Sequence, residues 1–312
     1  MKRLSIIVPC YNEQETIDIY LQEMKQVESN MSLEFEYLFV NDGLNDETII
    51  CLKEAANKYT NVNYISFSRN FGKEAALIAG LEAVTGDLIT VMDVDLQDPP
   101  ELLPEMYEKI QEGYDIVGTR RSNRVREPVL RSFFAKKFYQ VINQISDTEM
   151  VDGARDFRLM TRQVVDAILE LNEVNRFSKG IFSWVGFDTY YISFENRERS
   201  AGETSWNFWS LFKYSLEGII NFSEAPLTFA TLIGLGSCIM SILAMIYFFL
   251  DNLVTQNPVP GWPSLVCIIL FLGGLQLFCL GIVGKYIGKI FTEVKNRPNY
   301  IIKESYFKSE DE

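Results

Sequence analysis

The stretch DLITVMDVDLQDPP, residues 87–100, joins a strongly apolar segment to three closely spaced aspartates. Its first half has the apolar character of a buried strand, and the Pro-Pro pair ends that strand. Asp93 and Asp95 therefore fall at the carboxyl end of the strand, two residues apart. Like charges this close repel each other unless something positive lies between them. The stretch indicates that a cation binds at this strand end.

The residues before and after this stretch alternate strand and helix patterns. Apolar strand patterns occur in LSIIVP (4–9), FEYLFV (35–40), VNYISF (62–67), DLITVMDV (87–94) and DIVGTR (115–120). Amphipathic segments separate them, with helices expected over 12–27, 46–59 and 72–84. Continuous apolar strands separated by amphipathic helices predict an α/β fold with a doubly wound, mostly parallel sheet.

Polar motifs follow three of these strands, at Pro9–Glu13 (PCYNE), Val40–Gly43 (VNDG) and Asp93–Gln97 (DVDLQ). Ligands of such sheets bind at the carboxyl ends of the strands, so the motifs predict one shared site. Asp93, Asp95 and Gln97 offer oxygen ligands to Mg²⁺ or Mn²⁺, which would also clamp a diphosphate. The competing interpretation of Asp-x-Asp is a solvated loop. The chain contains neither a GxGxxG motif nor a Walker P-loop.

Two uncharged runs, Ala225–Leu250 and Asn252–Gly284, are long enough to cross a bilayer. The alternative is a pair of buried helices in a soluble protein. Lys and Arg follow the second run, and the 251–262 connector has neither, which predicts an outside connector and cytoplasmic ends. The expected organisation is a catalytic domain over 1–205, a juxtamembrane amphipathic helix over 206–224, two spans over 225–290 and a cytoplasmic tail over 291–312. Segments 128–146 and 206–224 are amphipathic, and either pack on the sheet or lie in the membrane interface.

Charge and composition narrow the chemistry. The net charge of −13 argues against a nucleic-acid partner. A local basic block over 120–137 calls for an anionic partner, or is attracted simply to anionic lipid. The chain has no histidine, so the commonest general base and zinc ligand are absent. Five cysteines without metal-site spacing are typical of a reducing compartment.

Several motifs together resemble those of family 2 glycosyltransferases, and of their polyprenyl-phosphate hexosyltransferase branch. This branch includes dolichyl-phosphate mannose synthases and bactoprenol glucosyltransferases. The motifs are IIVPCYNEQETI, FVNDGLNDET, SRNFGKEAALIAGLEAVTGD, MDVDLQDPPELL, DFRLM and RSAGETSW, and they extend in order over nearly the whole chain. The two C-terminal spans match the bacterial members.

The resemblance implies a GT-A fold and assigns roles to individual residues. On the donor side, it implies that Pro9, Tyr11 and Glu13 surround the nucleoside, that Asp42 binds the base, and that Lys73 and Asp93 bind the nucleotide sugar. It implies that the metal is held by Asp93, Asp95 and Gln97. The cations implied to bind phosphates are Arg120, Arg131, Lys179 and Arg199. Asp95 and Asp156 are the expected catalytic residues. Asp156 either acts as a base or orients the cationic side chains that bind the acceptor, or else it is a structural partner of Arg155 or Arg158.

The implied reaction is an inverting transfer of a hexose, most simply glucose, from a UDP-sugar to undecaprenyl phosphate at the cytoplasmic leaflet. A phosphate nucleophile is already anionic, which suits a chain without histidine. Alternatives are a GDP-mannose donor, another lipid or glycan acceptor, and a non-catalytic membrane partner. Bacterial relatives imply a homo-oligomer. Asn41, Leu44 and Ser205 depart from the family pattern, which affects donor-side detail.

Overall fold

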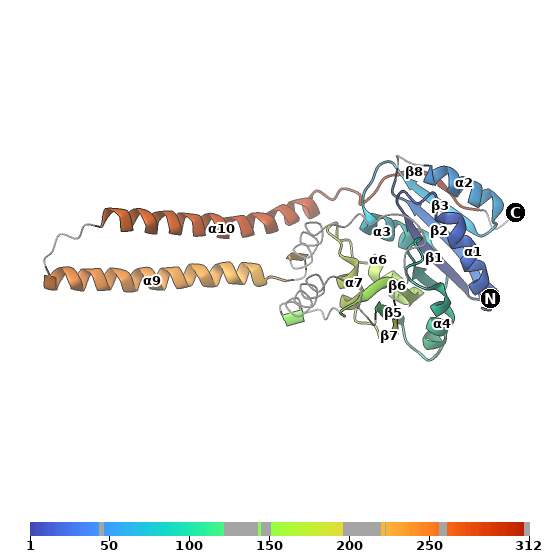
Figure 1. Ribbon diagram of the computed structural model, residues 1–312, viewed down its shortest axis with the longest axis horizontal. Helices are drawn as coiled ribbons and strands as arrows, with labels where there is room; N and C mark the ends of the chain where they lie inside the picture. The colour runs from blue at the N-terminus through green and yellow to red at the C-terminus, as the bar shows by residue number, and fades with distance from the viewer. Residues whose placement is uncertain are drawn as a thin grey trace.

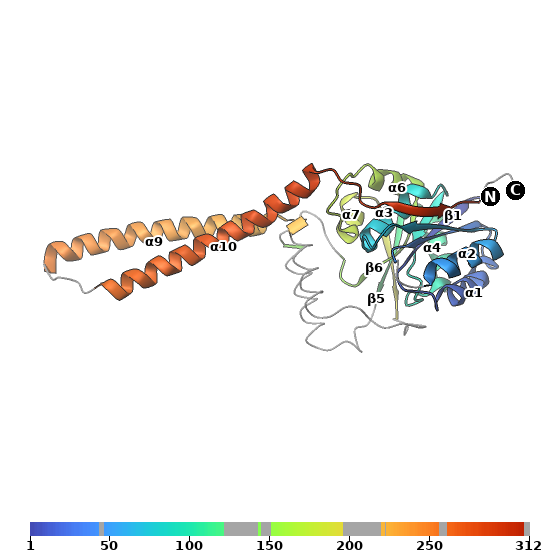
Figure 2. The same ribbon diagram turned by 90° about the horizontal axis from the view of Figure 1, so that it is seen from above.

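The computed structural model describes residues 1–43, 47–121, 143–144, 151–195, 220–221, 223–255 and 261–308. They form a layered α/β domain and two long helices that project side by side from it (Figure 1; Figure 2). The predicted segments 128–146 and 206–224 lie outside the described residues, apart from 143–144, 220–221 and 223–224.

The sheet of the described domain has eight strands in the order β7-β5-β6-β4-β1-β2-β3-β8. The strands are β1 Arg3–Cys10, β2 Glu34–Asn41, β3 Val62–Phe67, β4 Leu88–Val91, β5 Ile116–Arg121, β6 Ala154–Thr161, β7 Thr189–Phe194 and β8 Ile302–Tyr306. The helices of the domain are α1 Ile17–Glu28, α2 Thr48–Lys58, α3 Lys73–Ala83, η1 Pro100–Leu102, α4 Leu103–Gln111, α6 Arg162–Leu169 and α7 Ser178–Trp184.

The central strands confirm the predicted doubly wound, mostly parallel sheet. β1 pairs in parallel with both β2 and β4, and β2 pairs in parallel with β3. β6 is inserted antiparallel between β4 and β5, and β8 lies antiparallel beside β3. The sequence did not predict β6, β7 or β8. In β6, ARDFRLMT, charged residues interrupt the apolar run that marks a buried strand.

Helices cover both faces of the sheet, because neighbouring strand residues point to opposite sides. Ile6 belongs to a buried cluster that includes residues of α1, α2 and α4, whereas Ile7 belongs to a second cluster with residues of α3, α6 and α7. The contact of α3 with β1 is close: a Cβ added at Gly80 would lie 2.3 Å from Cγ2 of Ile7. Glycine thus lets α3 approach the sheet closely.

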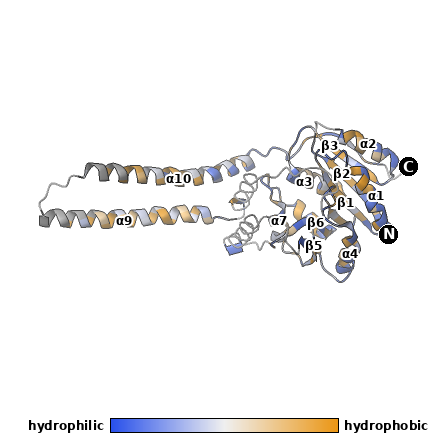
Figure 3. Cartoon of the chain, in the orientation of Figure 1, coloured by the Kyte–Doolittle hydropathy of each residue, from blue (hydrophilic) through white to orange (hydrophobic). Residues whose placement is uncertain are grey.

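The two long helices are α9 Ala225–Thr255 and α10 Trp262–Val294. Each contains a candidate membrane span, Ala225–Ala244 and Ile268–Val294, of which 6% and 0% are buried. Figure 3 shows their mainly apolar character and the hydrophilic residues at the domain end of α10. A core helix of a soluble protein would bury these side chains, so their exposure indicates membrane association.

The chain after α10 returns to the domain and forms the edge strand β8. The rings of Tyr300 and Phe67 stack with centroids 5.1 Å apart, and the backbone N–H of Ser68 donates to the carbonyl of Ile301 at 2.9 Å. The sequence predicts a cytoplasmic tail over 291–312 and does not reveal this strand. Because β8 belongs to the domain's sheet, the end of α10 lies beside the domain.

Candidate active site

The sheet order places the three polar motifs along one edge. β4, β1 and β2 are neighbours and run in parallel, so the residues after Val91, Cys10 and Asn41 leave the sheet side by side, as predicted. Two of these turns contain a non-glycine residue with left-handed backbone, Asn12 at φ +57° and Leu96 at φ +56°. Such conformations carry strain and gather at functional sites.

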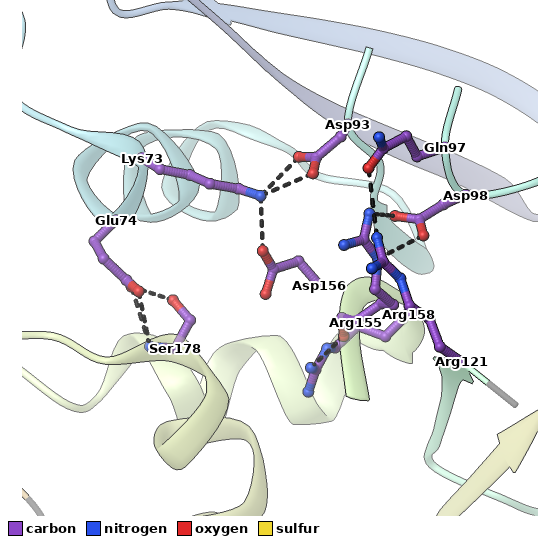
Figure 4. Close-up of polar contacts among 10 residues, drawn as sticks. All are labelled: Lys73, Glu74, Asp93, Gln97, Asp98, Arg121, Arg155, Asp156, Arg158 and Ser178. Carbon is purple, nitrogen blue, oxygen red and sulfur yellow. Dashed lines mark hydrogen bonds and ion pairs between the residues drawn. The ribbon is translucent and has the colours of Figure 1, made fainter. Parts of the chain in front are cut away.

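A lysine lies between two of the predicted carboxylates. The Nζ of Lys73 is 2.7 Å from Oδ1 and 3.0 Å from Oδ2 of Asp93, and 2.7 Å from Oδ2 of Asp156 (Figure 4). The side chains are 42%, 26% and 20% exposed, in the order Lys73, Asp93, Asp156. We call these three residues the open cluster. It supplies the positive group that the sequence required beside Asp93.

Asp156 and Lys73 hold each other in the ionised form. Burial on its own would raise the pKa of Asp156, but Lys73 and then Lys179 more than offset this and hold that pKa well below its usual range. Burial likewise opposes the charge of Lys73, yet Asp156 and Asp93 raise the pKa of its ammonium above the ordinary value. Asp156 therefore has little capacity to take up a proton, which favours an orienting role over that of a base.

The position of Lys73 is set by Asp42. The two carboxylate oxygens of Asp42 accept the backbone N–H groups of Phe71 and Gly72 at 2.6 and 2.8 Å. Gly72 has φ +96°, a left-handed conformation that favours glycine, and it directly precedes the first residue of α3. Asp42 is 4% exposed, and burial raises its pKa against these hydrogen bonds. The contacts with the α3 loop are additional to the predicted contact of Asp42 with the base.

Asn41 explains one departure from the family pattern. Its Nδ2 donates to the carbonyl of Gly43 and to Oγ of Ser66, both at 3.1 Å, and its Oδ1 accepts the N–H of Gly43 at 3.1 Å. An aspartate could not donate to the Gly43 carbonyl. The buried amide therefore stabilises the turn that carries Asp42.

A second ion pair lies beside the open cluster and was not predicted. Arg155 donates through Nε to Oδ1 of Asp98 at 2.7 Å and through its terminal nitrogen to Oδ2 at 3.2 Å (Figure 4). The side chain of Asp98 is 1% exposed. We call Asp98 and Arg155 the closed pair. The closed pair joins the turn after β4 to β6. Arg155 thus has Asp98 as its ionic partner, while Asp156, the next residue, has Lys73.

The predicted metal ligands occupy the same turn. Asp95 is 7% exposed and its Oδ1 accepts the N–H of Gln97 at 3.2 Å, while Oε1 of Gln97 accepts from Arg121 at 3.4 Å. Within the described residues no group of three His, Cys, Asp or Glu side chains is placed to hold a metal ion. Mg²⁺ commonly uses one or two carboxylates, with substrate phosphates and water as its other ligands. Asp93 and Asp95 fit that donor set.

The remaining predicted residues are distributed around this edge. Tyr11 is 52% exposed, and the Glu13 carboxylate accepts from the hydroxyl of Thr16 at 2.8 Å. Pro9 is in β1. Arg120, in β5, donates to Oγ of Ser193 at 2.8 Å. Arg131 and Arg199 lie outside the described residues.

Lys179 is half-buried near Asp156, and its helix is tied to α3. Burial lowers the pKa of Lys179 although the Asp156 carboxylate opposes this. The residue before it, Ser178, donates its backbone N–H to the Glu74 carboxylate at 3.1 Å and its hydroxyl to the same group (Figure 4). Since Glu74 follows Lys73, this contact links Lys179 to the open cluster. The sequence analysis missed it.

Comparison with known proteins decides the family. The model of glycosyl transferase family 2 matches residues 5–169. The putative glycosyltransferase CsbB of Bacillus subtilis (strain 168) is 43% identical over 308 residues, which cover 99% of this chain and 93% of that protein. This chain belongs to glycosyltransferase family 2.

Two further proteins are similar to this glycosyltransferase. The SfII prophage-derived bactoprenol glucosyl transferase of Shigella flexneri is 44% identical over 304 residues, covering 97% of this chain and 98% of that protein. Among solved structures, mannosyl-3-phosphoglycerate synthase from Rubrobacter xylanophilus is 13% identical, with a TM-score of 0.49 over 83% of this chain and 78% of that one.

Proposed function

We propose that this glycosyltransferase moves glucose from UDP-glucose to a polyprenyl phosphate at the cytoplasmic face of a membrane. The observation that carries the proposal is the 44% identity, over 97% of the chain, to a protein named bactoprenol glucosyl transferase. That similarity includes the two apolar helices as well as the domain. The products are a lipid-linked glucosyl phosphate and UDP.

On the donor side, the open cluster and the turn after β4 would bind the sugar diphosphate. Lys73 offers its ammonium to phosphate oxygens, and Asp42 keeps the loop before α3 in the position that supports Lys73. Pro9, Tyr11 and Glu13 would line the nucleoside, next to Asp42 at the adjoining strand end. Fixed charges that are already in place need no rearrangement during transfer.

A divalent metal ion is part of the proposal. Asp93 and Asp95 would hold Mg²⁺ or Mn²⁺, with Gln97 alongside. When bound, the ion would neutralise charge on the departing UDP. Lys73 now shares Asp93, so its ammonium would turn toward the diphosphate or stay with Asp156 when the ion is present.

On the acceptor side, Lys179 would bind the lipid phosphate, together with Arg120, Arg131 and Arg199. Asp156 would hold the cations in place and leave the attack to the phosphate oxygen, which carries its own negative charge. The new bond joins that oxygen to the anomeric carbon, and the bond from the carbon to UDP breaks with inversion. Assembly into a homo-oligomer remains a prediction.

The proposal is tested with membranes that contain the full-length protein. They are incubated separately with radiolabelled UDP-glucose and GDP-mannose, with and without EDTA, and lipids are then extracted. Label from UDP-glucose should enter the lipid fraction only without EDTA. If only GDP-mannose labels the lipid fraction, the donor is GDP-mannose and not UDP-glucose. If labelling persists in EDTA, transfer does not require a divalent metal ion.

A further inference from the structure

The contact between the catalytic domain and the end of α10 centres on one residue, Asn175, in the loop between α6 and α7. Its backbone N–H and its Nδ2 donate to Oε1 of Glu293 at 2.9 and 2.8 Å. Lys289 donates to its Oδ1 at 3.0 Å, and Asn221 donates to its carbonyl at 3.0 Å. We call these four residues the Asn175 junction. Both hydrogen-bonding groups of the Asn175 side chain are used within it.

The α10 side of the junction is a single helix face. Ile282, Tyr286, Lys289 and Glu293 are half-buried, whereas the residues between them are exposed. Spacings of four, three and four residues place them in one row along the helix. The row continues the contact, because the hydroxyl of Tyr286 donates to the carbonyl of Ser223 at 2.6 Å, just before α9. Charged residues near the end of an apolar helix carry a cost that such specific pairing offsets.

The junction lies close to the active site along the chain. Asn175 precedes Ser178 by three residues, and Ser178 is bound to Glu74, the neighbour of Lys73. The N–H of Val174 also donates to Glu293, at 3.0 Å. One short segment therefore contacts the membrane helix at its start and α3 at its end. In both views the domain end of α10 lies near α7 (Figure 1; Figure 2).

We propose that the Asn175 junction is a positioning contact, which holds the catalytic domain at a fixed height and orientation on the membrane helices so that the open cluster meets an acceptor phosphate at headgroup level. The inference rests on the proposed function, because it concerns how an acceptor embedded in the bilayer is reached. A polyprenyl phosphate cannot move out to find a misplaced site, whereas a soluble acceptor can.

The test uses full-length protein in liposomes with two acceptors, undecaprenyl phosphate in the bilayer and geranyl phosphate in the aqueous phase. Asn175→Asp removes the amide donors and sets a carboxylate against Glu293, and Lys289→Ala is the milder variant. Lys285→Ala is the matched control, because Lys285 is exposed on the same end of α10. Hydrogen exchange at Val174 and Asn175 reports, independently of activity, whether the junction has opened.

In both junction variants, the KM for undecaprenyl phosphate should rise about tenfold, with larger effects in Asn175→Asp. The KM for UDP-glucose and kcat/KM for geranyl phosphate should stay within about twofold of wild type, as should every parameter of Lys285→Ala. Adding Glu293→Gln to Asn175→Asp restores an amide–carboxylate pair and should recover most of the loss.

Equal losses with both acceptors would overturn the inference, because they would show that the junction shapes the site itself. Unchanged kinetics despite faster exchange at Val174 and Asn175 would overturn it as well. If wild-type protein makes no lipid-linked glucose, the proposed function fails and the inference fails with it. If wild-type protein makes lipid-linked glucose but the junction variants do not respond as expected, only the inference is contradicted.

Discussion

The open cluster and the closed pair lie side by side at the same strand end, yet they differ in access to solvent. The carboxylate of Asp98 is 1% exposed and is bound through both oxygens to Arg155. Asp93 and Asp156 are 26% and 20% exposed and share one lysine. Arg155 is 21% exposed but is bound to Asp98, whereas we propose that the open cluster exchanges Lys73 contacts for a substrate. We therefore propose that ionic contacts of similar length serve two purposes, a structural one in the closed pair and a functional one in the open cluster.

The largest expected effect comes from the open cluster. Asp156→Asn removes the charge that holds Lys73 and Lys179, and we expect kcat to fall by about 10²- to 10³-fold. Asparagine also gives up the stability that the lowered pKa of Asp156 contributes, so turnover is compared at a temperature where both proteins are folded. The measurement is glucose transfer with purified protein in liposomes. Turnover within a factor of about three of wild type would break the comparison.

The closed pair should respond in the opposite way. Asp98→Asn leaves the half-buried Arg155 without its charged partner, which should lower the free energy of unfolding by about 3 kcal/mol. Transfer by the fraction that remains folded should stay close to wild type. Denaturant unfolding followed by circular dichroism measures the first effect, and activity at low temperature the second. An Asp98→Asn protein with wild-type stability and no activity would contradict this assignment, because the closed pair would then be functional and not structural.

The smallest expected effect is the pH dependence of the open cluster. The lowered pKa of Asp156 gives stability that is present above the unfolded value of roughly 3.9 and is lost as pH falls through the folded value. The raised pKa of Lys73 gives stability that is present below about 10.4 and is lost as pH rises through the folded value. Asp156 and Lys73 should therefore not titrate between about pH 5 and pH 9.

Lys179 is the exception, because burial lowers its pKa. The KM for the lipid acceptor should rise severalfold on the alkaline side, at a lower pH than an ordinary lysine would give. Lys179→Arg should move this alkaline limb to higher pH, since arginine stays charged. The pH profile of the acceptor KM measures it. Profiles that coincide for the two proteins would remove Lys179 from the acceptor site.

The sequence predicted the strand ends better than the contacts between them. The apolar runs of β1 to β5 identify a buried parallel sheet, and the sheet order then follows from general rules, so Asp42 and Asp93 could be placed at one edge. Nothing local in DFRLM marks an antiparallel strand, because its charged residues face partners that are distant in sequence. Asp98 and Arg155 are 57 residues apart, and only the fold brings them together.

The same limit applies to the membrane end. Hydropathy found both long helices, but the half-buried face of α10 and the strand β8 depend on contacts with residues more than 100 positions away. The roles of Asp95 and Gln97 at a metal, and of Arg131 and Arg199 at phosphates, stay predictions. The Asp93–Lys73–Asp156 bridge was unforeseen, although the like charges had indicated that some cation was needed.

The most direct measurement follows UDP release and lipid labelling together, with purified protein, UDP-[¹⁴C]glucose and liposomes that contain undecaprenyl phosphate. Wild type and Asp98→Asn, assayed where the variant is folded, should release one UDP for each labelled lipid, and Asp156→Asn should do neither above background. Labelled lipid formed at the wild-type rate by Asp156→Asn, or UDP released by wild type without labelled lipid, would contradict the account.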